Sequence, residues 1–303
     1  MGYFKPKILL LELLVFVLVI TSFESCSNKS DTTANPIPEE PDVNAPVETP
    51  KDFSFYVGAD LSYVNELEDF DAEYRENGKL VDPFKLFSEK GCNITRVRLW
   101  NNPPTGYSDF KDVKKTIERA KKENMHVLLD FHYSDFWADP HKQTIPDAWK
   151  HISDVKILSD SVYQYTYSTL SNLADANLAP ELVQVGNETN IEILQQENNT
   201  DTSTINWERN SQLFNAGIKA VNDINSEYNL SIKKILHIAQ PENAFPWFEK
   251  AVEHNLVDFD IIGLSYYPKW SSYGLNQIPT AINSLTNQFN KPSVLDYHPM
   301  LGK

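Results

Sequence analysis

Short apolar runs recur along the chain beyond residue 53, and longer amphipathic stretches separate them. The apolar runs predict strands at 53–62, 93–100, 125–133, 181–188, 233–239, 259–268 and 292–297. Several are almost continuously apolar, as strands buried on both faces of a sheet are. The intervening stretches predict helices at 82–91, 108–124, 154–177 and 207–228, the first with Asp82 as N-cap and Gly91 as C-cap. Strands that alternate with helices predict a parallel sheet.

The number of these units indicates the architecture. Seven strand-like runs without a glycine-rich phosphate-binding loop fit a (β/α)8 barrel better than a doubly wound nucleotide-binding sheet. The sequence stops soon after the seventh run. We therefore predict an α/β fold, a TIM-type barrel truncated after the seventh strand and occupying residues 53–303. Without its final βα unit, the barrel is expected to be open between its seventh and first strands.

The N-terminal part of the sequence is typical of an exported protein. Two lysines precede an apolar run at 8–20, and Cys26 follows a serine, as at a lipoprotein cleavage site. We predict a lipoprotein-type signal peptide at 1–26 with Cys26 lipidated; the alternative is a signal peptide cleaved nearby that leaves Cys26 free. Residues 27–52 are rich in proline and predict a disordered tether. The expected location is the bacterial outer membrane or cell surface.

Composition narrows the possible partners. The net charge of −15 argues against nucleic acid or an anionic membrane surface as a binding partner, because both repel an acidic protein. Only Cys26 and Cys92 are present, so no disulfide framework is expected. No cysteine and histidine cluster has zinc spacing. The abundant aromatic residues suit stacking against sugar rings, and they suit a large core equally well.

Polar residues stand where the predicted strands end, which is where a barrel places its chemistry. They are Asp60, Trp100, His132, Glu188, His237 and Tyr266. Glu188 follows Asn187 at the end of the fourth strand. Partial burial there can raise the pKa of a glutamate until it donates a proton to a glycosidic oxygen. The alternative is a solvated glutamate that opens a loop.

The segment 130–149 is the densest in polar and aromatic side chains. Carbohydrate sites need this combination of hydrogen-bonding groups and aromatic faces. The candidates are His132, Tyr133, Ser134, Asp135, Trp137, Asp139, His141, Gln143 and Trp149. A metal site made from the acidic and histidine members is an alternative, although their spacing matches no standard site. Near the end of the sixth strand stand Tyr266, Tyr267 and Trp270, for which a core aromatic cluster competes with a binding role.

Two arginines alternate along the second strand. Arg96 and Arg98 therefore point to the same face. An arginine inside a barrel is unfavourable unless it is paired, so a carboxylate neighbour is expected. That neighbour is either a catalytic nucleophile or a structural partner, Asp60 or Asp130.

Several motifs in this order resemble glycoside hydrolase family 53, the arabinogalactan endo-β-1,4-galactanases. They are "GADLS", "RVRLWNNPPTGY", "LLDFHYSDFWADPHKQTIPDAW", "VQVGNETN" and "FDIIGLSYYPKW", and the similarity extends from about residue 55 to residue 292. The resemblance implies a retaining endo-hydrolase of the β-1,4-galactosidic bonds in plant pectic galactan. It implies no cofactor, although some members carry calcium on loops after the seventh strand.

The resemblance also assigns roles. It makes Glu188 the acid/base and Asn187 a partner of the sugar 2-hydroxyl, with Arg96 and Tyr266 orienting the nucleophile and Arg98 a second candidate for that role. The full substrate-binding set that we predict is Arg96, Arg98, Trp100, His132, Asp135, Trp137, Asp139, Asn187, Tyr266 and Trp270.

The nucleophile is not identified from the sequence. A retaining glycosidase needs a second carboxylate about 5 Å from the first. The family places it at the end of the seventh strand, six residues past a lysine. Six residues past Lys291 is Tyr297, and Asp296 comes one position early. An offset of one residue is expected to turn Asp296 away from the barrel mouth, and aspartate is also one methylene shorter than glutamate. Asp296 is therefore a poor substitute.

Three functions follow from these observations. The first is an endo-acting β-1,4-galactanase. The second is a barrel that lacks the nucleophile and binds galactan without hydrolysing it. The third is a barrel glycosidase that acts on another β-linked glycan, such as mannan, because subsite residues rather than the fold decide which sugar is bound.

Overall fold

The computed structural model describes residues 15–16, 55–196 and 204–298 of the 303-residue chain. Apart from residues 15–16, the predicted signal peptide 1–26 lies outside the described residues. Cys26 and the predicted tether 27–52 lie outside them as well. These predictions therefore stay untested.

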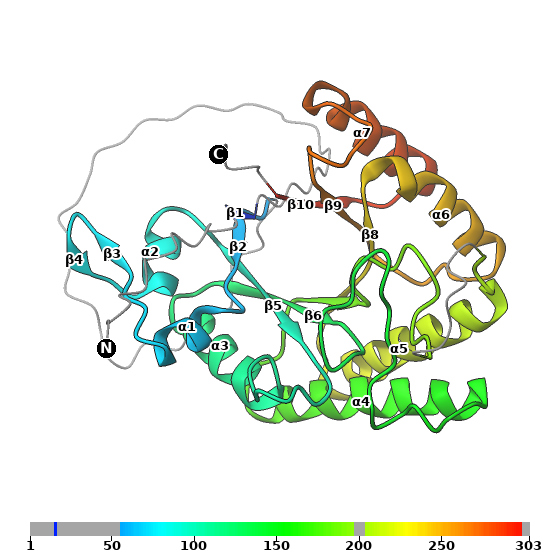
Figure 1. Ribbon diagram of the computed structural model, residues 1–303, viewed down its shortest axis with the longest axis horizontal. Coiled ribbons are helices and arrows are strands. Elements are labelled where there is room, and N and C mark those ends of the chain that lie inside the picture. Colours follow the sequence, from blue (N-terminus) through cyan, green and yellow to red (C-terminus); the bar gives the residue numbers. More distant parts are fainter. Residues whose placement is uncertain (1–14, 17–54, 197–203, 299–303) are drawn as a thin grey trace, which may run out of the picture.

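Seven parallel strands form a curved sheet, as the sequence predicts (Figure 1). They are β2 (Gly58–Asp60), β5 (Ile94–Leu99), β6 (His126–Phe131), β7 (Leu182–Val185), β8 (Lys233–Ala239), β9 (Ile261–Tyr266) and β10 (Ser293–Tyr297). Each pairs in parallel with the next, in chain order. All seven strands expected from the apolar runs are confirmed.

Three further short strands of the described residues lie outside this parallel series. The short strand β1 (Val15–Phe16) pairs antiparallel with β2 and lies next to β10, at the place where the barrel was expected to be open. A hairpin joins β3 (Arg75–Glu76) to β4 (Lys79–Leu80). Its two turn residues, Asn77 and Gly78, both have positive φ, as a tight hairpin turn requires.

The helices surround the sheet on the outside (Figure 1). They are α1 (Val64–Asp69), α2 (Pro83–Glu89), α3 (Phe110–Lys122), α4 (Val155–Asp175), α5 (Trp207–Tyr228), α6 (Pro241–Glu253), the 3-10 helix η1 (Leu275–Gln277) and α7 (Ile278–Phe289). The four predicted helices correspond to α2 to α5, whereas α1, α6 and α7 were not predicted. Asp82 caps α2 by accepting hydrogen bonds from two backbone amides. The predicted C-cap is one residue off: Lys90 is the C-cap, and Gly91 follows it with φ +96°.

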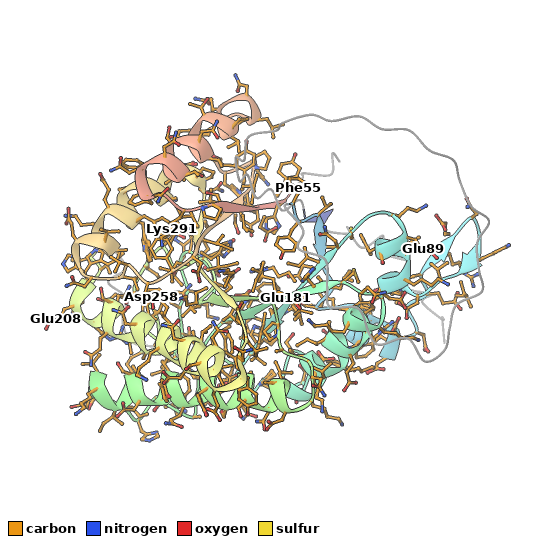
Figure 2. The ribbon with its side chains drawn as sticks, turned by 180° about the vertical axis from the view of Figure 1, so that it is seen from behind. Phe55, Glu89, Glu181, Glu208, Asp258 and Lys291 are labelled. Atoms are coloured by element: carbon orange, nitrogen blue, oxygen red, sulfur yellow. The ribbon has the colours of Figure 1, made fainter. Side chains whose placement is uncertain are left out.

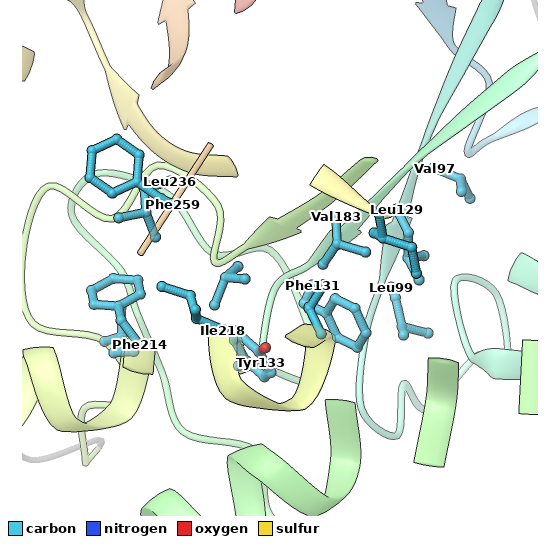
Figure 3. Packing of buried hydrophobic residues seen from close by; sticks show 14 of the residues in the cluster. Val97, Leu99, Leu129, Phe131, Tyr133, Val183, Phe214, Ile218, Leu236 and Phe259 are labelled. Carbon is cyan, nitrogen blue, oxygen red and sulfur yellow. The ribbon is translucent and has the colours of Figure 1, made fainter. Parts of the chain in front are cut away.

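The strand residues that face the helices form the main core. Val97, Leu129, Val183 and Leu236 belong to this core together with Ile218 of α5 (Figure 3). Side chains fill the space on both faces of the curved sheet (Figure 2). Apolar burial of this extent is the main stabilising contribution to the fold.

A second apolar cluster marks the inner face of the strands. It consists of Ile94, Leu128, Leu182, Ile235, Ile261 and Val294, one residue from each of six neighbouring strands. Because side chains alternate along a strand, the residues two and four positions further on also face the interior. This alternation determines which polar residues, described below, face the interior.

No helix among the described residues is long and apolar enough to cross a membrane.

Candidate active site

A layer of polar side chains lies directly above the inner apolar cluster. Counting two residues on from its six members gives Gly263 and five polar residues, each from a different strand: Arg96, Asp130, Gln184, His237 and Asp296. All five side chains are buried. Buried polar groups are stable only when they are hydrogen-bonded or paired.

Arg96 is the centre of this layer. Its guanidinium lies 3.1 Å from an Asp60 carboxylate oxygen and 2.6 Å from one of Asp130. The Asp296 carboxylate is 3.6 Å away. Burial alone would lower the pKa of Arg96, but the surrounding carboxylates outweigh burial and raise that pKa. Both structural partners expected from the sequence are therefore present, together with a third carboxylate.

The backbone after β7 adopts an unusual conformation that places Asn187 and Glu188. Gly186 has φ +92°, and Glu188 has φ +47°. A Cβ atom on Gly186 would lie 2.6 Å from the Thr189 side chain, so only glycine fits there. The Gln143 side-chain amide donates to the carbonyl oxygens of Asn187 at 2.8 Å and Glu188 at 3.2 Å. A positive φ at a non-glycine residue is the kind of strain found at functional sites.

Asn187 is held by partners on both sides. Its side-chain oxygen accepts a 2.7 Å hydrogen bond from Arg96, and its side-chain nitrogen donates to the Ala138 carbonyl at 2.8 Å. The backbone N–H of Glu188 donates to Nδ1 of His237 at 3.2 Å. Burial lowers the pKa of His237, so this ring is neutral and can accept at Nδ1. These contacts fix the pair at the carboxyl end of the fourth barrel strand.

The Glu188 carboxyl group is buried, with 5% of the residue exposed. One of its oxygens accepts a 2.8 Å hydrogen bond from the Tyr267 hydroxyl. Burial raises the pKa of Glu188, and the nearby Asp296 carboxylate adds to the rise. Hydrogen bonds from Ser265 and Tyr267 and the electrostatic influence of His298 act in the opposite direction without cancelling it. A glutamate in this environment can hold a proton and give it to a leaving group.

Asp296 faces the interior of the barrel. It lies two residues beyond Val294, which belongs to the inner cluster, and Tyr297 takes the other face. One carboxylate oxygen of Asp296 lies 3.0 Å from Nε2 of His298. The expectation that Asp296 turns away from the mouth is therefore wrong. It assumed that the family's spacing from Lys291 sets which strand residues face inward, whereas the inward face follows from Val294.

Tyr267, rather than Tyr266, belongs to the site. The Tyr266 hydroxyl donates to the Tyr273 carbonyl at 2.8 Å, and its ring lies beside Tyr297. The predicted role of Tyr266 in orienting a nucleophile is therefore not supported by its position. Tyr267 bonds to Glu188, and its ring stacks on His298 with the centroids 4.0 Å apart.

Arg98 lies among aromatic rings. Its guanidinium carbon is 3.8 Å from the Tyr63 ring centroid, 4.5 Å from that of Trp137 and 4.8 Å from that of Trp100. Burial lowers the pKa of Arg98. Within the part of the chain that the structure describes, no carboxylate forms a direct ion pair with it, although the Asp60 carboxylate is near enough to attract its charge. The electron-rich faces of these three rings stabilise the guanidinium charge through cation–π contacts.

Three predicted binding residues, Trp100, His132 and Asp135, hold neighbouring loops in place. Nδ1 of His132 accepts hydrogen bonds from the Trp100 indole at 3.2 Å and from the Ala138 amide at 3.1 Å. Its Nε2 therefore carries the proton and lies 3.0 Å from Asp130. The two Asp135 carboxylate oxygens accept hydrogen bonds from the backbone amides of residues 102 and 147.

Among the described residues, no group of three cysteine, histidine or acidic side chains could hold a metal ion.

Two cavities meet at Glu188. The smaller has a volume of about 360 Å³, and its walls include Asp60, Tyr63, Arg96, Arg98, Trp137, Asn187 and Asp296. The larger has a volume of about 1470 Å³, and its walls include Trp207, Gln240, Asn243, Trp247 and Trp270. Asp139, Glu188 and Tyr267 line both. Glu188 thus stands at the junction of a cleft that continues on either side of it.

The predicted binding residues divide accordingly. Arg96, Arg98, Trp137 and Asn187 line the smaller cavity, Trp270 lines the larger one, and Asp139 lines both. The walls of these two cavities do not include Trp100, His132, Asp135 or Tyr266. Sequence reasoning missed Gln184 and His298, and it named Gln143 and Tyr267 only as candidates without including them in the binding set. Counting in steps of two along each strand from its first inward-facing apolar residue would have found three of them, whereas Gln143 lies in a loop.

Comparison with known proteins identifies the family. The model for glycosyl hydrolase family 53 matches residues 56–297. The chain belongs to this family.

Two solved structures, a family 53 catalytic domain and a fungal β-1,4-galactanase, share the fold of this chain. The Ignisphaera aggregans family 53 catalytic domain superposes with a TM-score of 0.70 at 32% identity, covering 78% of this chain and 66% of that one. A fungal β-1,4-galactanase gives a TM-score of 0.71 at 29% identity, with 78% and 71% covered. The TIM-type barrel architecture is therefore confirmed.

Two curated galactanases are similar in sequence. The arabinogalactan endo-β-1,4-galactanase of Cellvibrio japonicus is 56% identical over 242 residues, which cover 80% of this chain and 64% of that protein. The endo-β-1,4-galactanase of Bacillus subtilis is 36% identical over 248 residues, covering 78% of this chain and 54% of that protein. The chain thus spans less than two thirds of the length of these two family 53 relatives.

Proposed function

We propose that this protein is an endo-acting, retaining glycoside hydrolase that cleaves β-1,4-galactosidic bonds in plant pectic galactan. The observation that carries the proposal is the buried Glu188 carboxyl, with its raised pKa, at the junction of two open cavities. A cleft that continues on both sides of the proton donor suits attack within a polysaccharide chain. The names of the similar relatives support β-1,4-galactan as the substrate.

In the first step, Glu188 donates its proton to the glycosidic oxygen as the bond to the anomeric carbon breaks. Asp296 is the carboxylate that we propose as nucleophile, because it faces the smaller cavity beside Arg96. Its oxygen bonds to the anomeric carbon and forms a glycosyl ester. In the second step, the ionised Glu188 takes a proton from water, and the water oxygen displaces the Asp296 carboxylate.

The other cavity residues bind and orient the sugar in this proposal. Asn187 lies between Arg96 and Ala138 and offers its amide to the hydroxyl next to the anomeric carbon. The Trp137 ring provides an apolar face for the pyranose ring. Neither step requires a metal ion or another cofactor, because the two carboxyl groups supply the proton and the nucleophile.

The test is incubation of the purified protein with β-1,4-galactan, β-mannan and β-xylan in parallel. We expect new reducing ends from galactan alone, together with an early fall in polymer length, which distinguishes internal from terminal cleavage. Reducing ends from another glycan alone would reassign the substrate. Galactan binding without any release would instead make the protein a galactan-binding barrel and would contradict the proposed activity.

The expected location is a separate proposal. The sequence pattern around Cys26 supports export and lipid attachment, which would hold the barrel at a membrane surface through residues 27–52. Expression of the full sequence in a bacterium, with detergent phase separation, tests this proposal. The protein should enter the detergent phase, and Cys26→Ser should move it to the aqueous phase; identical partitioning of the two would contradict lipidation.

A further inference from the structure

The larger cavity is a groove that follows one face of helix α6. Its wall includes Asn243, Pro246, Trp247, Lys250 and His254, which recur at helical spacing from the first turn of α6 to its C-cap. At a rise of about 1.5 Å per residue, this face extends for about 16 Å. The groove volume of about 1470 Å³ also exceeds the usual range for small-ligand pockets, about 300–1,000 Å³. The groove can therefore hold more than one sugar ring.

The arrangement of the two carboxylates gives the groove a direction. Asp296 and Arg96 line only the smaller cavity, whereas Glu188 lines both. The sugar whose anomeric carbon is attacked by Asp296 must therefore lie in the smaller cavity. Glu188 protonates the oxygen that leaves, so the leaving part of the chain extends into the groove along α6. This assignment rests on the proposed function.

Aromatic side chains stand at both ends of the groove. Near Glu188, the Trp270 ring lies 5.3 Å from that of Tyr267 and is 68% exposed. At the far end, the Trp207 ring lies 5.3 Å from that of Trp247 and stacks against His254 at 5.8 Å. Exposed and half-buried rings along a cleft match the apolar faces of pyranose sugars.

The far aromatic group also has an unsatisfied polar atom. Nε1 of Trp247 is buried and has no hydrogen-bond partner among the described residues. Native proteins rarely leave such a donor without an acceptor. This donor belongs to a residue of the groove wall, since Trp247 lines the larger cavity. Helices α5 and α6, which carry Trp207 and Trp247, lie on the same side of the barrel (Figure 1).

We propose that Trp207, with Trp247 and His254, forms a distal subsite for the leaving-group portion of a β-1,4-galactan chain. The subsite is separated from the reacting bond by the length of the α6 groove. It acts by binding substrate and takes no part in proton transfer. Its contribution is therefore expected only for chains long enough to reach it, which makes Trp207 a determinant of chain-length preference.

The test measures binding without hydrolysis. Glu188→Gln provides a background for calorimetric titration with β-1,4-galacto-oligosaccharides of increasing length and with galactan polymer. We expect the affinity to rise with the length of the oligosaccharide. Trp207→Ala in the same background should weaken the binding of long chains by roughly 3- to 10-fold and should leave the binding of short chains unchanged. Tyr228→Ala is the matched control, because Tyr228 is a partly buried aromatic residue at the opposite end of α5. This control should leave all affinities unchanged.

A second variant covers the case in which Trp207→Ala does not fold. His254 is exposed, so His254→Ala should fold and should weaken the binding of long chains in the same direction. Unchanged length dependence in the folded variants, or no binding of any galacto-oligosaccharide, would overturn the inference. Reducing-end release by the unmodified protein is measured separately. If the unmodified protein releases reducing ends but Trp207→Ala does not change binding, only the subsite proposal is contradicted. If binding depends on Trp207 but no reducing ends are released, only the hydrolase proposal is contradicted.

Discussion

The Tyr267 hydroxyl donates a 2.8 Å hydrogen bond to the Glu188 carboxylate. This bond stabilises the ionised form of a carboxyl group whose pKa is raised by burial. The contact therefore adjusts a group that must be protonated in one step and ionised in the next. The tyrosine directly follows β9 and the glutamate lies three residues beyond β7, so the contact depends on the packing of β7, β8 and β9 side by side.

Replacement of this tyrosine should change the pH profile. In Tyr267→Phe the ionised form of Glu188 loses a donor, so the pKa of Glu188 rises further and the alkaline limb of kcat/KM moves to higher pH. The maximum rate should fall by roughly tenfold or more, because ionised Glu188 must also act as a base. Tyr266→Phe is the control, since its hydroxyl bonds to Tyr273. Equal pH profiles for the unmodified protein and Tyr267→Phe would contradict this role.

Asp296 can be tested by changing its charge and its reach. Asp296→Asn cannot form a glycosyl ester, and we expect kcat on galactan to fall by roughly a thousandfold or more. Asp296→Glu keeps a carboxylate that can form the glycosyl ester, so it should retain far more activity than Asp296→Asn. An Asp296→Asn variant with normal turnover would show that another group is the nucleophile.

Arg96 is expected to matter for stability as much as for activity. Arg96→Met leaves several buried carboxylates without their cation, and we expect a loss of about 3–5 kcal/mol in the free energy of unfolding at pH 7. The control Arg75→Met removes an exposed pair with Glu73 and should lose no more than about 1 kcal/mol. Chemical denaturation measures both.

The loss in Arg96→Met should also depend on pH. Burial would raise the pKa of Asp60, but Arg96, Arg98 and Ser62 together lower it. A lowered carboxyl pKa stabilises the fold above the unfolded value of about 3.9, and that stabilisation disappears as the pH falls through the folded value. The difference between the unmodified protein and Arg96→Met should therefore shrink below about pH 4. A constant difference from pH 7 to pH 3 would contradict the pairing.

The turn before Glu188 offers a test that touches no catalytic group. Gly186→Ala places a Cβ 2.6 Å from Thr189 at a φ of +92°. We expect the unfolding free energy to fall by more than about 1 kcal/mol and kcat to fall with it, because Glu188 moves. Thermal unfolding and initial rates measure the two effects. Full activity in Gly186→Ala would mean that the turn does not set the position of Glu188.

Much of the architecture could be predicted from the sequence because buried parallel strands are continuous apolar runs. Glu188 and Arg96 could be placed because each stands at or near the end of such a run. Helix α6 was not predicted. It starts after Gln240, which has φ +66°, and contains Pro246, so its sequence lacks a normal cap and carries a residue that usually breaks helices.

The errors at Tyr266 and Asp296 share one physical cause. Tyr266 and Tyr267 are neighbours, as are Asp296 and Tyr297, and a strand sends neighbours to opposite faces. Only the inner apolar cluster, formed in the folded barrel, decides which member of each pair faces the cavity. The position of Asp135 could not be predicted for a different reason. Its carboxylate accepts hydrogen bonds from backbone amides of two loops that are distant in the sequence, and these contacts form only in the folded protein.

The proposed role of Glu188 in galactan hydrolysis is tested most directly by the initial rate of reducing-end release from β-1,4-galactan, measured for the unmodified protein and for Glu188→Gln. Glutamine keeps the shape of the side chain and can still accept from Tyr267, but it carries no transferable proton. We predict measurable release by the unmodified protein and a rate roughly 10²- to 10⁴-fold lower for Glu188→Gln, with galactan binding retained. Equal rates for the two proteins would contradict the assignment of Glu188 as the acid/base.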